Sequence, residues 1–171
     1  MSRASLFSTL GLVVALSAMA PSIAACAPRD EVVWTDGEDA VMKAATAEAL
    51  KSLPDFWAKF DAHEPTRTNF YVKVGVPTDH GGVEHMWTAV LSHTGDVIMG
   101  RLDNDPEDVR AMKAGAEFRV DPARISDWMY AKDEKFYGAF TTRAMAPRIS
   151  AAQRKEAEAM LAPTPLEPSV H

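Results

Sequence analysis

The sequence predicts an α+β domain with N-terminal helices, a curled or barrel-like sheet of 5–6 mostly antiparallel strands, one short inserted helix and a C-terminal helix. Apolar residues recur at helical spacing over residues 38–60, whereas they alternate with a period of two between about 70 and 143. The connections between the alternating segments are short, which favours antiparallel pairing. With 171 residues, 47% of them hydrophobic, the chain is long enough for one packed domain.

Residues 1–25 have the layout of a signal peptide, with Arg3 before an apolar run that is too short to be a good membrane span. Ile23-Ala24-Ala25-Cys26 resembles the bacterial lipobox, whose cysteine is acylated and becomes the mature N-terminus. The alternatives are an incidental thiol or an ordinary cleavage, after Ala20 or Ala27, that would leave a proline directly behind the cut.

We therefore expect lipidation at Cys26, with residues 26–37 as lipid anchor and tether. The expected location is a membrane, through the lipid at Cys26, on its periplasmic side. A soluble periplasmic or secreted protein is the alternative.

The single domain is predicted to span residues 38–162, and it begins with helical periodicity. Apolar residues such as Met42, Leu53 and Phe60 share one helix face. Pro54 has no amide hydrogen and clashes with the preceding turn, so we expect a break or kink there and a second helical piece behind it.

Strands are predicted over residues 70–76, 84–91 and 97–103, with a hairpin turn at 92–96. Asp105 as N-cap, Pro106 at the first helical position and Gly115 as the stop predict the short inserted helix.

Three more strands are expected at 116–120, 124–131 and 136–143. Ser150 and Gln153 form a capping box for a terminal helix through Leu161. The proline-rich residues 163–171 are expected to be a disordered tail.

The composition excludes some functions. The formal net charge of −6 argues against nucleic acid as a partner, because phosphate binding requires a cationic surface. The one cysteine allows no disulfide within the chain. No glycine-rich phosphate loop is present, and no cofactor is predicted.

Five short motifs follow one another in an order that resembles the YegJ-like bacterial family, a domain of unknown function. They cover about residues 70–144 and are Tyr71-Val72-Lys73-Val74, Glu84-His85-Met86-Trp87, Gly100-Arg101-Leu102-Asp103-Asn104-Asp105-Pro106, Ile125-Ser126-Asp127-Trp128-Met129 and Thr141-Thr142-Arg143. The resemblance implies a bacterial protein and brings no known catalytic residue with it.

Three kinds of site compete for the polar residues of these motifs. A metal site would draw on the imidazole and carboxylate donors, but their spacing is poor, so no metal is predicted; these donors are His63, His80, His85, His93, Glu84 and Asp103. An acid/base or metal-assisted hydrolase would use Glu84, His85, Asp103 and Asp127. Strand parity sends Glu84 and His85 to opposite faces of the sheet, which weakens both possibilities.

A binding module requires the least special chemistry, and we favour it over an enzyme. Aromatic and polar side chains beside one another would hold a protein, peptide or glycan in a shallow groove. The candidates for ligand binding are Trp87, Asn104, Trp128, Tyr130 and Arg143. The alternative is that Trp87 and Trp128 fill the core.

Overall fold

The computed structural model describes residues 40–168, and within them it confirms the α+β class. The helices are α1 (Ala40–Asp61), α2 (Phe140–Met145) and α3 (Ala151–Met160). The strands are β1 (Arg67–Pro77), β2 (Val83–Thr94), β3 (Val97–Leu102), β4 (Glu117–Val120), β5 (Ile125–Lys132) and β6 (Lys135–Gly138). The predicted signal peptide, Cys26 and the tether up to residue 37 lie outside the described residues.

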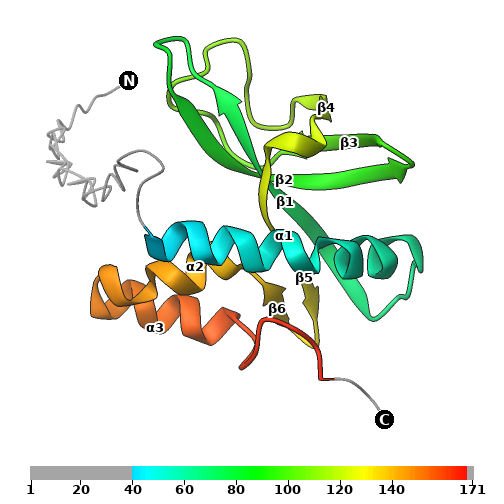
Figure 1. The fold of residues 1–171 in the computed structure, drawn as a ribbon, viewed down its shortest axis with the longest axis vertical. Helices are drawn as coiled ribbons and strands as arrows, with labels where there is room; N and C mark the ends of the chain where they lie inside the picture. Colours follow the sequence, from blue (N-terminus) through cyan, green and yellow to red (C-terminus); the bar gives the residue numbers. More distant parts are fainter. Residues whose placement is uncertain (1–39, 169–171) are drawn as a thin grey trace, which may run out of the picture. The chain divides into compact units, whose positions relative to one another are not determined.

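The six strands form one antiparallel sheet in the order β4-β3-β2-β1-β5-β6 (Figure 1). The outer strands β4 and β6 do not pair with each other, so the sheet is open and does not close into a barrel. Strand β1 bonds to both β2 and β5, which places its residues at the centre of the sheet.

Helix α1 covers one face of β1 and β5. Phe56 of α1 is fully buried against Trp128 and Tyr130, with ring centroids 5.4 Å and 6.5 Å away. The indole Nε1 of Trp128 donates to the carbonyl of Ala49 at 2.9 Å, so its polar atom is satisfied inside the core. Burying each of these large side chains contributes roughly 1.5–3 kcal/mol, which fixes the helix on the sheet.

Helix α1 is continuous, so the break predicted at Pro54 is wrong. Pro54 is exposed, and the missing hydrogen bond therefore falls on the solvent side of the helix. The adjacent residues Leu53, Phe56 and Trp57 still pack in the core against the sheet, and their burial keeps the helix on the sheet on both sides of Pro54.

The short helix predicted behind Asp105 does not form; residues 103–116 are bends and turns. Asp105 accepts a hydrogen bond from the amide of Ala114 and caps no helix. The carboxylate of Glu84, on β2, accepts from the amides of Glu107 and Asp108 at 2.9 and 3.0 Å. Side-chain carboxylates thus accept hydrogen bonds from backbone N–H groups of this segment, and these bonds stabilise a loop instead of a helix.

Strand β6 stops at Gly138, where the sequence predicts a strand up to Arg143. Gly138 has φ +77°, and a Cβ there would stand 2.2 Å from the carbonyl oxygen of Trp128. Ala139 then takes a left-handed φ of 53°, and α2 begins directly after it. The chain leaves the sheet here because the amides of Phe140 and Thr141 bind the Asp127 carboxylate.

The end of the chain follows the prediction for α3. Ser150 and Gln153 form the expected capping box at the start of α3. Residues 163–168, which the sequence predicts to be part of a disordered tail, form bends and neither a helix nor a strand. The amide of Gly138 donates to the carbonyl of Pro165 at 2.7 Å, and the carboxylate of Glu167 binds side chains of β1 and β5.

Candidate functional site

A buried polar chain joins β1, β5 and α2 on the sheet face away from α1. Lys73 of β1 is 8% exposed, Asp127 of β5 is 0% exposed and Thr141 of α2 is 3% exposed. The Lys73 ammonium donates to the Thr141 hydroxyl at 3.0 Å, and that hydroxyl donates to Asp127 Oδ2 at 2.6 Å. The threonine therefore bridges a buried cation and a buried anion.

Asp127 receives hydrogen bonds on both of its carboxylate oxygens. The amides of Trp128 and Phe140 donate to Oδ1 at 2.8 and 3.2 Å, while the amide and hydroxyl of Thr141 donate to Oδ2. Burial raises the pKa of Asp127, and the hydrogen bonds from Thr141 and Trp128 act against that rise. Because both carboxylate oxygens already accept these hydrogen bonds, Asp127 is poorly placed to accept a proton from a substrate.

Asp127 faces this way because β5 contains an irregularity. Lys73 is paired with Asp127, but Val74 is paired with Ile125, so Ser126 is an extra residue in β5. Ile125 and Trp128 can then both enter the core under α1, while Asp127 turns to the other face.

Lys73 connects the buried chain to the surface of the sheet. Its ammonium lies 5.5 Å from the ring centroid of Trp87, which is its partner on β2. Burial lowers the pKa of Lys73, and Asp127 opposes this effect. Burial also lowers the pKa of His85, and the charge of Lys73 lowers it further.

His85, Trp87 and Tyr71 lie on the same face as Lys73, at neighbouring positions of β1 and β2. The His85 ring lies over Gly75, where an added Cβ would stand 3.4 Å from Nε2. Trp87 and Tyr71 are half-buried and His85 is exposed. We call these four residues, Tyr71, Lys73, His85 and Trp87, the open-face site.

The predicted carboxylates Glu84 and Asp103 take different places. Glu84 is on the opposite face from His85, as strand parity predicts, and its oxygens hold the amides of residues 107 and 108. Asp103 is exposed just after β3; its charge adds to the burial that raises the pKa of Tyr71. Of the four predicted groups, His85 and Asp127 lie on the face of Lys73, which stands between them in the sheet, and Asp103 lies beside Trp87 at the end of β3.

Three of the predicted ligand-binding residues serve the fold. Trp128 is 2% exposed within the core, and Tyr130 is 1% exposed and donates its hydroxyl hydrogen to Glu167. Arg143 donates to the backbone carbonyls of Gly138, Ala162 and Phe136. Asn104 is exposed on the loop after β3, so Trp87 is the predicted binding residue that lies in the open-face site.

The histidines do not gather around a metal position. His93 stacks on Trp57 with centroids 4.2 Å apart and bonds to Asp61, while His63 and His80 lie on exposed turns. Within residues 40–168, no group of three or more histidine, cysteine, aspartate or glutamate side chains could hold a metal ion.

The sequence singled out neither Tyr71 nor, as binding or catalytic groups, Lys73 and Thr141. All three stand inside the quoted motifs, but a lysine in an alternating strand and a threonine in a predicted strand suggest solvent exposure. A usable signal was parity, since Lys73 is flanked by Val72 and Val74 and must point away from the core that they enter.

The model of a bacterial family described as "Uncharacterized protein conserved in bacteria (DUF2314)" matches residues 39–162, so this chain belongs to that family. The chain is similar to the uncharacterized protein YegJ of Escherichia coli K12, with 32% identity over 113 residues, or 65% of this chain and 71% of YegJ. The predicted YegJ-like resemblance is confirmed.

A putative ankyrin repeat protein of Neisseria meningitidis serogroup B is 27% identical over 135 residues, which cover 75% of this chain and 53% of that protein. No solved structure matches the chain. In the described part of the chain, no helix is long and apolar enough to cross a membrane.

Proposed function

We propose that this chain is an exported bacterial lipoprotein whose domain binds a protein, peptide or glycan ligand on the open-face site. The observation that carries the binding proposal is the half-buried Trp87 beside Tyr71 and His85, on the face that α1 leaves free. The ring faces of tryptophan and tyrosine stack on sugar rings and on peptide side chains. The export and lipid proposal is supported by the layout of residues 1–26 alone.

The buried chain under Trp87 supports a binding role because it holds the site in a fixed geometry. Lys73 is kept beneath Trp87 by Thr141 and Asp127, so little conformational entropy is lost when a ligand arrives. His85 adds a polar ring nitrogen at the rim that can donate or accept a hydrogen bond. A hydrolase built on Glu84 and Asp127 has less support, since both carboxylates already receive backbone amides.

Binding to defined probes tests the proposal. The purified domain is applied to a bacterial glycan array and to a random peptide library, and Trp87→Ala is compared with wild type for every ligand found. We expect a loss of at least tenfold in affinity, because the stacking surface is removed. Leu50→Ala, on the exposed side of α1, is the matched control and should bind normally.

Two results would contradict the open-face site. One is a set of ligands whose affinity is unchanged by Trp87→Ala, and the other is the absence of any binder in both collections. Circular dichroism of each variant verifies that the fold is intact.

A further inference from the structure

The last described residues form a strap along the edge of the sheet. Phe136 of β6 makes a parallel bridge with Leu161, and the amide of Ala162 donates to the Phe136 carbonyl at 2.9 Å. The Gly138 amide donates to the Pro165 carbonyl at 2.7 Å. We call residues 161–168 the strap; it covers the outer edge of β6, which would otherwise have unpaired backbone groups.

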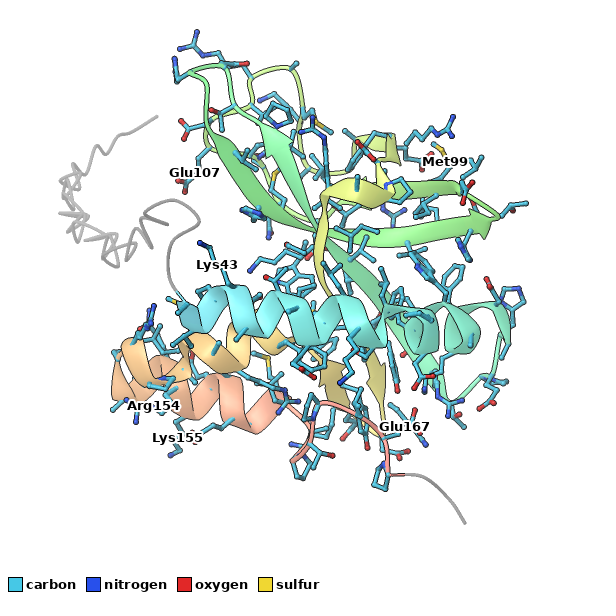
Figure 2. The ribbon with its side chains drawn as sticks, viewed as in Figure 1. Lys43, Met99, Glu107, Arg154, Lys155 and Glu167 are labelled. Carbon is cyan, nitrogen blue, oxygen red and sulfur yellow. The ribbon has the colours of Figure 1, made fainter. Side chains whose placement is uncertain are left out.

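Two side chains fix the strap: Arg143 donates to the carbonyl of the buried Ala162, and Glu167 lies beside the ends of β5 and β6 (Figure 2). Arg67 of β1 binds this carboxylate with two nitrogens, Nε at 2.7 Å and Nη2 at 3.1 Å. The Tyr130 hydroxyl donates at 2.6 Å and the Lys132 ammonium at 2.5 Å. The carboxylate is thus held by a guanidinium fork, a phenol and an ammonium, and 11% of the Glu167 side chain is exposed.

The receptor for this carboxylate is built into the sheet. Arg67 and Lys132 are direct partners across β1 and β5, so two cations stand beside each other. Like charges at directly opposite positions of a sheet repel each other. Arg67 also forms an ion pair with Glu64, but the Glu64 side chain is 53% exposed, so solvent weakens its effect. An anion between Arg67 and Lys132 relieves this repulsion, and accordingly the pKa of Glu167 is lowered to about 2, chiefly by its hydrogen bond from Arg67.

The receptor and its occupant belong to different parts of the chain. Arg67, Tyr130 and Lys132 lie within residues 39–162, which the family model matches, whereas Glu167 lies beyond that match. The strap also binds in the way that a peptide ligand can, by a few backbone hydrogen bonds at a sheet edge and a carboxylate held by several donors, with residues 163–166 forming bends between them.

We propose that Arg67, Tyr130 and Lys132, together with the edge of β6, form a second binding site for a peptide segment that carries a carboxylate. In this chain the strap occupies the site, and an acidic peptide segment of another protein binds there when it displaces the strap. The site is separate from the open-face site, since its residues come from the ends of β1 and β5 near the strap.

A competition experiment on the full chain tests the proposal. The probe is a fluorescent, C-terminally amidated peptide with the sequence of residues 161–171, whose only carboxylate is the glutamate side chain. In wild type the attached strap competes at an effective concentration in the millimolar range, so the probe should bind weakly. In Glu167→Gln the strap loses its charged anchor, and we expect at least tenfold tighter binding of the probe by fluorescence anisotropy.

Matched controls identify the receptor. Adding Arg67→Gln or, separately, Lys132→Gln to Glu167→Gln should return the probe to weak binding, and a glutamine version of the probe should bind weakly throughout. Glu158→Gln, exposed on α3, should behave as wild type. Trp87→Ala should leave probe binding unchanged, which separates this site from the proposed function.

The proposal is overturned if Glu167→Gln binds the probe no more tightly than wild type does. It is also overturned if the glutamine probe binds equally well, because the carboxylate would then play no part. Light scattering of Glu167→Gln tests a further outcome. If this variant forms a dimer in which each chain places its strap on the other, the site binds a second copy of the chain, and the proposal of a peptide from another protein is refuted.

Discussion

At the residue scale, Asp127 decides how three elements meet. A fully buried carboxylate is unfavourable unless it is hydrogen-bonded and paired, and Asp127 has four donors together with Lys73 behind Thr141. Its oxygens bind the first amides of α2, so the same group that holds Lys73 in place also ends the sheet at β6. The geometry of the open-face site therefore depends on a residue that no ligand would touch.

Asp127→Asn should destabilise the domain by about 3–5 kcal/mol, because one member of a buried ionic network becomes neutral. Each carboxylate oxygen of Asp127 accepts a hydrogen bond from at least one backbone N–H. Whichever way the asparagine side chain is turned, its NH2 group therefore faces a backbone N–H, and neither donor is satisfied. Urea unfolding measures the loss. Asp96→Asn, at the exposed turn after β2, is the control and should change stability by less than about 0.5 kcal/mol; an equally small effect at Asp127 would contradict this account.

At the element scale, sequence rules succeeded where the deciding contacts are local. The capping box at Ser150 and the alternation in β1 and β2 depend on residues a few positions apart, and both form as predicted. The rules failed where a distant side chain decides, as with Glu84, which binds amides 23 and 24 residues further along the chain. The early end of β6 depends in the same way on Asp127, and no local pattern at residues 136–143 indicates it.

The candidate site was predictable to a similar degree. Parity correctly separated Glu84 from His85 and grouped His85 with Trp87. On charge alone Asp127 could pair with Lys73 or Arg143, and parity could not choose between them because the extra residue Ser126 shifts the register of β5. The aromatic residues Trp128 and Tyr130 gave no sequence signal that distinguishes a core position from a binding surface.

Glu84→Ala should loosen residues 103–116 and leave the sheet intact. The amides of Glu107 and Asp108 would lose a charged acceptor, and the stability should fall by about 1–2 kcal/mol. Hydrogen exchange followed by NMR should show faster exchange at these two amides while those of β1 are unaffected. Glu48→Ala, on the outer side of α1, is the comparison; unchanged exchange at residues 107 and 108 would show that Glu84 does not hold the loop.

The strap should make stability depend on pH below about 4.5. The pKa of Glu167 falls from 4.5 to about 2 on folding, so its contribution is present above pH 4.5 and disappears as the pH falls toward 2. Because the strap lies at the surface, where solvent screens the ion pairs, we expect only about 1 kcal/mol. Unfolding of wild type and Glu167→Gln across this range measures the difference, which should close in acid; a gap that is independent of pH would contradict it.

At the scale of the whole molecule, the proposals place two binding surfaces on one sheet and connect the domain to a membrane by a lipid. The open-face site lies at the centre of the sheet, on β1 and β2, while the strap covers its β6 edge. Both surfaces are formed by contacts among residues 40–168, many of them between distant parts of the sequence, so we expect ligand binding to require no membrane. What the anchor would add is a high local concentration at the membrane surface.

Cys26→Ser should release the protein from the membrane. The chain has a net charge of −6, so anionic headgroups repel it, and attachment depends on acyl chains. In a Gram-negative host, wild type should sediment with membranes and incorporate an alkyne-labelled palmitate, whereas Cys26→Ser should be soluble and unlabelled. Ser22→Ala, four residues before the cysteine, keeps the thiol and should behave as wild type. Sedimentation of Cys26→Ser with the membranes, or wild type without label, would refute lipidation at Cys26.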